Sequence, residues 1–334
     1  MENENMPLEK ESVQPRRVVP VKLIWMLISA AIFLSCFFSL VGAMGSRFNG
    51  RALGQGFLYS VAVLMLSLGA GLCMARGCIN LSLPGTMSLS ALVFASAFSG
   101  GMAFFPAMLL ALLVGAVFGA LNGIFTIQRR RNVQLVTALS SLLVGMIASY
   151  FASQVSTEGN AWRISLEIAR GTDTVFAIIW IALAIGLCFV GAIGGGRLFR
   201  TFEEDTVKDG GGNRFLWSVV AGVLAAMAGI FQIVRMRAYS MNVAGDMSYT
   251  SSVFLVLITA GILIPNMRGS YAEALFGFLS IVFATFAYGM LSMMFSYLAF
   301  TVSVQHIVYA VLGLLMLIPN LLIYKNKKEE PGRL

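Results

Sequence analysis

The chain has 334 residues, of which 58% are hydrophobic and only 11% are charged, against about 25% charged residues in soluble domains. The formal charge of +8 does not indicate a nucleic-acid partner, because the Lys and Arg residues lie in short clusters between apolar runs, where they set membrane topology. The apolar runs are about 20 residues long and do not alternate, which excludes barrel strands and predicts helices in a lipid bilayer.

In chain order, the apolar runs predict an all-α, polytopic integral membrane protein with ten spans. Residues 1–20 form a polar N-terminal tail, and 324–334 a charged C-terminal tail. The first run follows the tail and is too long for a cleaved signal peptide, so we expect it to be retained as an anchor. The spans lie near 21–43, 54–75, 85–103, 104–127, 133–155, 174–195, 215–235, 249–264, 270–296 and 300–323.

The distribution of positive charge predicts the orientation. With a cytoplasmic N-terminus, 17 of the 23 Lys and Arg residues, Lys22 among them, fall on the inside. Cytoplasmic segments carry such an excess. We therefore expect both termini in the cytoplasm and an even number of crossings, in a bacterial plasma membrane.

Three segments outside the spans have functional potential. Residues 196–214 are the most polar internal piece on the cytoplasmic side and form a natural docking surface. Residues 156–173 face outward, and their mixture of apolar and charged residues predicts a short amphipathic helix. Between the second and third spans, Gly77 to Gly85 interrupt an apolar region, and broken helices at membrane depth often line a pathway.

The sequence lacks the motifs of ATP hydrolysis, of common hydrolases and of metal binding. The chain has no GxxxxGK[ST] phosphate loop, so we expect no ATP hydrolysis by this chain, and no HExxH or GxSxG motif is present. A disulfide framework is not expected from its four cysteines, nor a metal site around its single histidine, His306. Apart from Glu273 and His306, the spans carry almost no ionisable side chains for a coupling ion.

Three motifs give the chain a resemblance to a known family. GRLFRTFEEDTVKDGGGNR carries Gly196, Arg197, Arg200, Glu204 and Asp205 in the order of a short cytoplasmic coupling helix. RGCINLSLPGTMSLSALV and ALNGIFTIQRRRNVQLVTALSSL match two further stretches. Over roughly residues 55–320, the chain resembles the ATP-binding-cassette (ABC) importer permeases for branched-chain amino acids, simple sugars of the ribose type and nucleosides, with a type II importer-like fold.

The resemblance implies partners and roles. Such permeases pair with a second permease, identical or homologous, and act with a separate ATPase that binds ATP and Mg, and with an extracytoplasmic solute-binding protein. It assigns ATPase coupling to Arg197, Arg200, Glu203, Glu204 and Asp205. Arg163 and Arg170 are candidates for docking the binding protein, and Asn80, Ser82 and Asn122 for the substrate path.

The substrate class stays open between a simple sugar and a nucleoside, because the motif around Asn80 aligns with either branch. Pro265 and Asn266 stand where the sugar branch has glycines. A branched-chain amino acid is the alternative within the family. Outside the family, the alternatives are a self-sufficient secondary carrier or channel and a membrane scaffold that transports nothing.

Each candidate site also has a purely structural interpretation. Asn80, Ser82 and Pro84 could cap and shape a helix break. The spacing of Gly115, Gly119 and Gly123 favours close helix packing over substrate contact. His306 is expected to be a hydrogen-bonded interior or interface histidine, and the outer arginines ordinary loop charges.

Overall fold

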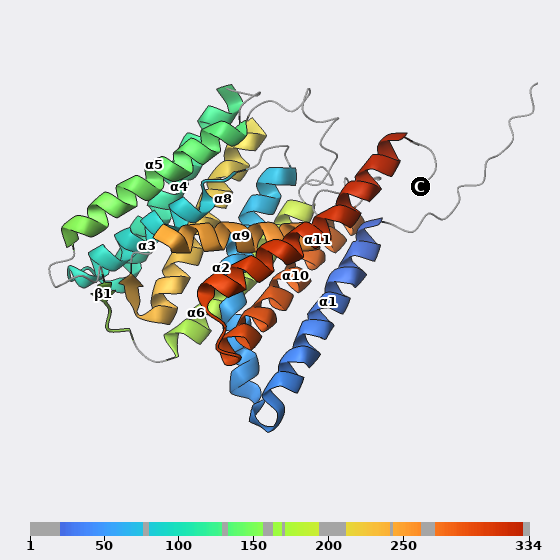
Figure 1. The fold of residues 1–334 in the computed structure, drawn as a ribbon. Helices are drawn as coiled ribbons and strands as arrows, with labels where there is room; N and C mark the ends of the chain where they lie inside the picture. Colours follow the sequence, from blue (N-terminus) through green and yellow to red (C-terminus); the bar gives the residue numbers. More distant parts are fainter. Residues whose placement is uncertain are drawn as a thin grey trace, which may run out of the picture.

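The computed structural model describes residues 21–75, 80–128, 133–155, 163–168, 171–193, 212–240, 243–261 and 271–329. These residues form ten α-helices, one short 3-10 helix and two three-residue strands (Figure 1). In chain order they are α1 (Val21–Met44), η1 (Gly45–Arg47), α2 (Gly50–Ala75), α3 (Leu83–Ser99), α4 (Phe104–Gln128), α5 (Val133–Val155), β1 (Arg163–Ser165), α6 (Thr172–Ile193), α8 (Gly212–Met236), β2 (Ala238–Ser240), α9 (Val243–Thr259), α10 (Tyr271–Tyr297) and α11 (Val302–Glu329).

The α-helices fall on the ten predicted spans, and the all-α, polytopic membrane fold is confirmed. Their ends differ by a few residues where glycine intervenes. The helix α9 begins six residues before the predicted 249. It ends at Thr259 instead of 264, because Gly261 adopts a left-handed φ of +64°. The helix α3 ends at Ser99, just before Gly101 with a φ of +91°. Glycine adopts this conformation without the strain that a Cβ would cause.

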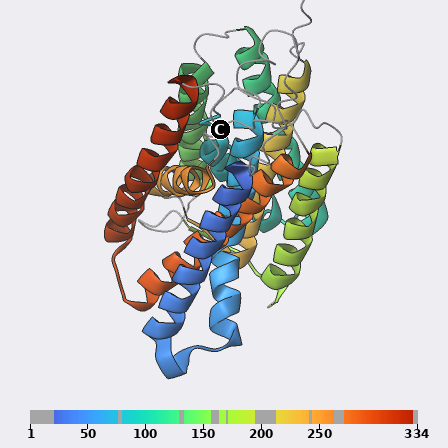
Figure 2. The same ribbon diagram turned by 90° about the vertical axis from the view of Figure 1, so that its right-hand side faces the viewer.

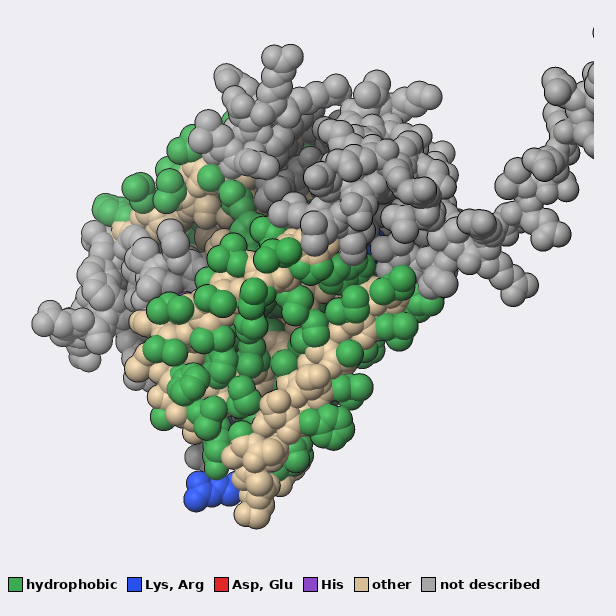
Figure 3. Space-filling model, turned by 45° about the vertical axis from the view of Figure 1, so that its right-hand side comes forward, with side chains coloured by type: hydrophobic (Ala, Val, Ile, Leu, Met, Phe, Trp, Pro, Cys, Tyr) green, Lys and Arg blue, Asp and Glu red, His purple; other side chains and the backbone are tan. Residues whose placement is uncertain are grey.

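The outer surface is apolar, as a bilayer requires. In the described part of the chain, five helices are long and apolar enough to cross a membrane by length and composition, namely α1, α2, α4, α8 and α10. Large apolar side chains such as Phe105, Met146 and Leu314 are about two-thirds exposed. Figure 3 shows one face covered by such side chains, with Lys and Arg at its lower end. Contiguous exposure of this extent would be unfavourable in water and is favourable in lipid.

The helices pack in pairs around α2 and α8. The helix α1 runs along α10, and α4 along α8, while α2 and α3 also pack on α8. The helix α9 lies across the bundle in Figure 1 and is seen end-on in Figure 2, where its neighbours run lengthwise. It contacts α2, α10 and α11. It is therefore a transverse helix inside the bundle.

Small residues allow α4 and α8 to approach closely. A Cβ at Gly119 would lie 2.5 Å from the Ser218 carbonyl oxygen, and one at Gly115 would lie 2.5 Å from that of Gly222. Both distances are too short for any side chain. The predicted packing role of Gly115, Gly119 and Gly123 is confirmed, since each faces the backbone of α8.

The segment 156–173, predicted to be an outer amphipathic helix, is described at 163–168 and 171–173. Residues Arg163–Ser165 form the strand β1, which pairs antiparallel with β2 so that Ile164 faces Tyr239. The predicted amphipathic helix is therefore wrong here. Ile164, Leu166 and Ile168 recur with a period of two, which is the period of a strand. Leu166 is buried and Glu167 exposed, as that alternation requires.

Candidate functional site

A buried hydrogen-bonded cluster forms at the break between α2 and α3. The Oδ1 atom of Asn80 accepts a bond from the Ser82 N–H at 3.0 Å and another from the Ser82 hydroxyl at 2.6 Å. The Ser82 oxygen in turn accepts a bond from Nδ2 of Asn122, on α4. The three residues predicted for the substrate path therefore meet, although Asn122 is 40 residues from Ser82.

The same cluster fixes the start of α3. The two bonds to Asn80 Oδ1 fold residues 80–82 into a tight turn of the kind that asparagine stabilises. The Ser82 carbonyl then accepts the Thr86 N–H at 2.9 Å and the Thr86 hydroxyl at 3.0 Å. Pro84 lies in the first turn, where its missing N–H costs nothing. The break is thus a turn held by the Asn80 side chain, after which α3 begins without a side-chain cap from Ser82.

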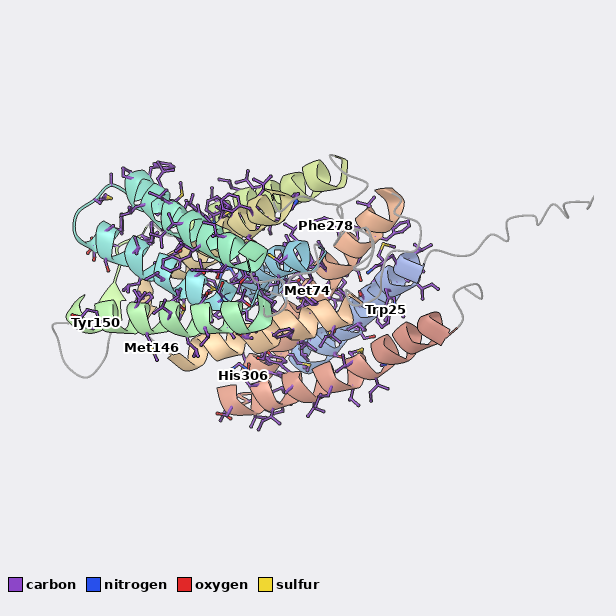
Figure 4. The ribbon with its side chains drawn as sticks, turned by 90° about the horizontal axis from the view of Figure 1, so that it is seen from above. Trp25, Met74, Met146, Tyr150, Phe278 and His306 are labelled. Atoms are coloured by element: carbon purple, nitrogen blue, oxygen red, sulfur yellow. The ribbon has the colours of Figure 1, made fainter. Side chains whose placement is uncertain are left out.

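A cleft opens beside this cluster, between the α2 end, the break and α9. Its cavity volume is about 20 Å³, roughly the space that one water molecule needs, within a hollow of about 370 Å³ that includes open solvent. Figure 4 shows Met74, one of its lining residues, in the middle of the bundle. The lining residues are Ala70 and Met74 on α2, Asn80, Leu81, Leu83 and Pro84 at the break, and Thr250, Val253, Phe254 and Leu257 on α9.

The chemistry of the cleft is that of a neutral, mostly apolar site. Its lining includes two polar side chains, Asn80 and Thr250, and no charged one. Asn80 is the member of the buried cluster that reaches the cleft wall. Ser82 and Asn122, 0% and 2% exposed, lie behind it. A solute here would meet apolar walls with a few hydrogen-bonding groups, the usual composition of small-molecule sites.

Other predicted site residues fall elsewhere. The coupling residues Arg197, Arg200, Glu203, Glu204 and Asp205 lie outside the described residues, as does Arg170. Arg163 begins β1, with Ser240 as its partner across the strand pair. Of the predicted site residues, the structure therefore describes the hydrogen-bonded cluster of Asn80, Ser82 and Asn122 and the backbone of Arg163, and their roles stay predictions.

Two further arginines accompany β2 at the same end of the bundle. The Arg235 guanidinium lies over the Tyr59 ring, 3.9 Å from its centroid, a cation–π contact. Arg237 adopts a left-handed φ of 52°, and its carbonyl accepts the Leu166 N–H at 2.9 Å. These contacts tie α2, α8 and the strand pair together.

The histidine differs from its prediction. His306 lies on α11 (Figure 4), and its ring centroid is 6.0 Å from that of Tyr309. Its buried Nδ1 has no hydrogen-bond partner within the described part of the chain. The expectation of a hydrogen-bonded histidine is therefore wrong for this atom.

Sequence reasoning missed the contribution of α9 and of Lys22. Thr250 and Phe254 line the cleft, and their spacing of four places them on one helix face. Lys22 was assigned to the cytoplasmic charge excess, yet it is only 4% exposed. No signal in the sequence distinguishes it from a topology-setting lysine. Among the described residues, no group of three or more His, Cys, Asp or Glu could hold a metal ion.

Part of the chain is similar to known transport proteins. Residues 52–196 match the sequence profile of the family described as "Branched-chain amino acid transport system / permease component". The autoinducer 2 import system permease protein LsrC from Enterobacter sp. (strain 638) is 26% identical over 219 residues, which are 61% of this chain. The match spans 62% of the length of that relative.

A solved structure shares the fold. It is described as an inward-facing conformation of a metal-chelate type ABC transporter, and its chain is 17% identical with a TM-score of 0.50. The match covers 90% of this chain and 99% of that one. At this identity the likeness concerns the fold alone.

Proposed function

We propose that the chain is a permease of the ABC type, which the match of residues 52–196 supports, and that it forms the translocation path of an ABC importer for a small neutral solute. The observation that carries this proposal is the cleft at the α2–α3 break. It lies inside the family-matched region on one side and against the transverse helix α9 on the other.

The lining of the cleft supports an uncharged solute. A branched-chain amino acid is a zwitterion, and its ammonium and carboxylate groups need charged or multiple polar partners when they leave water. The cleft lining offers two polar side chains and no charge. A simple sugar carries hydroxyl groups but no charge, and a nucleoside adds an aromatic base that Phe254 and Met74 could contact. LsrC, the curated relative, is named for autoinducer 2 import, and we place a sugar-like solute first.

The partners follow from the proposed role. An ATPase subunit would bind the cytoplasmic segment 196–214 through the charges from Arg197 to Asp205, where paired charges fix register more than they add affinity. A second permease subunit would complete the path. A solute-binding protein would dock on the outer side near Arg163 and Arg170, with Arg235 and Arg237 nearby.

Uptake into proteoliposomes tests the substrate class. The chain, its co-purifying ATPase and its binding protein would be reconstituted with ATP and offered labelled ribose, labelled adenosine or labelled leucine. We expect ATP-dependent uptake of the sugar or of the nucleoside. Uptake of leucine alone would contradict the argument from the uncharged cleft, and the Asn80→Asp variant, which introduces a charge into the cleft, should abolish uptake of a neutral solute.

A further inference from the structure

The C-terminal end of α9 is buried against α1 and α10. Gly261 turns the chain with its φ of +64°, and the N–H groups of Ala260 and Gly261 still bond to the carbonyls of Val256 and Ile258, at 2.8 and 3.0 Å. The last carbonyls of a helix have no partner within it. In a buried position they need donors from neighbouring elements.

Three side chains supply these donors. Lys22 Nζ on α1 donates to the Gly261 carbonyl at 3.0 Å. Ser29, also on α1, donates to the Thr259 carbonyl at 3.2 Å, and Ser280 on α10 donates to the Ala260 carbonyl at 2.9 Å. The two serine hydroxyls lie 2.8 Å apart. We call Lys22, Ser29 and Ser280 the α9 clamp.

The surroundings of the clamp are closely packed. A Cβ on Gly261 would lie 2.7 Å from Cδ2 of Trp25, so only glycine fits under this indole. Trp25 and Phe278 lie on α1 and α10 near this end of the bundle (Figure 4). Ser29 and Ser280 are both fully buried.

The position of Lys22 is unusual for a topology-setting residue. Lysines near helix ends normally extend their ammonium group to the aqueous interface. The Lys22 side chain instead remains buried and directs its charge to the C-terminal end of a helix, where the helix dipole favours a cation. Burial of an ammonium group is costly unless its partners are well placed. This location requires a reason beyond topology.

The clamp is continuous with the cleft through α9. Leu257 lies two residues before the first clamped carbonyl, and Phe254, Val253 and Thr250 follow on the preceding turns. We infer that Lys22, with Ser29 and Ser280, is a positioning residue that holds α9 in place and thereby sets the width of the cleft. The inference rests on the proposed function only in taking the cleft as the translocation path.

A purely stabilising clamp makes a different prediction. It would change the yield or the melting temperature of the protein when removed, and the folded molecules would keep the same cleft. The positioning role requires that α9 shift in molecules that remain folded. The exposure of a cleft residue on α9 separates the two.

The experiment measures cysteine labelling and needs neither an ATPase nor a solute. In a background with the four cysteines replaced by alanine, Thr250→Cys is introduced in the cleft and labelled with a small maleimide in native membranes. Lys22→Met should change its labelling rate roughly fivefold or more, the effect of losing one buried hydrogen bond on a local equilibrium. Lys22→Arg, which keeps charge and donor, should return the rate toward that of the parent.

Two controls accompany it. Ser35→Ala removes a hydroxyl from the same helix α1, where Ser35 is exposed and bonds to the Ala31 carbonyl at 2.9 Å, and it should leave the Thr250→Cys rate unchanged. Met102→Cys, exposed between α3 and α4, should label equally in every background. It reports on the amount of protein and on access of the reagent.

An unchanged Thr250→Cys rate in folded Lys22→Met protein overturns the inference. Should Lys22→Met fail to fold, Ser29→Ala removes one clamp donor without removing a charge and carries the same expectation. A changed labelling rate of Thr250→Cys together with absent ATP-driven uptake would support the positioning role of the clamp and contradict only the proposed transport role.

Discussion

The Asn122 amide on α4 donates to the Ser82 hydroxyl at the start of α3, and the Ser82 hydroxyl donates in turn to Oδ1 of Asn80 at the edge of the cleft. Three polar side chains from two helices and a break thus form one buried chain of hydrogen bonds. Its last member, Asn80, lines the cleft. A substitution at Asn122 should therefore change the position of the Asn80 side chain at the cleft wall, although Asn122 itself lies behind that wall.

Asn122→Ala should lower the stability of the protein by about 1 kcal/mol. A buried hydrogen bond lost in water-soluble proteins costs about 1–3 kcal/mol, but in membrane proteins the measured values average about 0.6, because the unfolded state in lipid also finds partners. Thermal unfolding in mild detergent measures the change. Leu121→Ala, at an exposed neighbouring position of α4, is the control and should lose less.

Gly119→Ala should destabilise the α4–α8 contact by about 1–3 kcal/mol, the range for overpacking. The added methyl would lie 2.5 Å from the Ser218 carbonyl oxygen, which is backbone and cannot move away alone. Gly145→Ala on α5 is the matched control, since a Cβ there meets nothing within 4 Å. That change should be neutral or slightly stabilising, because alanine favours helix more than glycine does. Equal melting temperatures for the two variants would contradict the packing.

Phe254→Ala should weaken solute handling without unfolding the protein. Phe254 lines the cleft from α9 and is partly exposed to it. Loss of its ring should raise the apparent KM for uptake about tenfold, a size expected when a pocket loses apolar contact. Met146→Ala, on the outer side of α5 (Figure 4), should leave KM unchanged. A tenfold effect at Met146 would place the path elsewhere.

Reversal of charge in the coupling segment should break ATPase association. A Glu204→Lys, Asp205→Lys variant would place like charges against the groove that the parent segment is proposed to bind, and like-charge contacts oppose docking. Affinity purification in mild detergent, followed by identification of the co-purifying proteins, is the measurement. The parent should retain the ATPase and the variant lose it, with both eluting as folded protein. Retention by the variant would remove these carboxylates from the coupling surface.

Much of the fold follows from the sequence because the bilayer restricts the choices. Apolar runs of about 20 residues can only be helices, and all ten predicted spans carry one. The α4–α8 contact was predictable because glycine every fourth residue marks close packing in lipid. The sequence predicted a shared role for Asn80, Ser82 and Asn122 but not their hydrogen bonds, since no local pattern encodes a contact between residues 40 positions apart.

Other features depend on tertiary contacts that a pattern does not carry. The transverse course of α9 is set by Gly261, Trp25 and the clamp on its last carbonyls. An apolar run has the same composition whether it crosses the bilayer or lies across a bundle. The strand β1 was expected as a helix because its segment mixes apolar and charged residues, yet its period of two is that of a strand and its partner β2 lies two spans further along the chain.

The most direct test of the central claim is solute flux in proteoliposomes that contain the purified chain alone or the chain with its ATPase, each with and without ATP. The account predicts flux of a neutral solute only when the ATPase and ATP are both present, and its loss in Asn80→Asp. Flux through the chain alone, independent of ATP and unaffected by Asn80→Asp, would contradict it and favour a self-sufficient carrier.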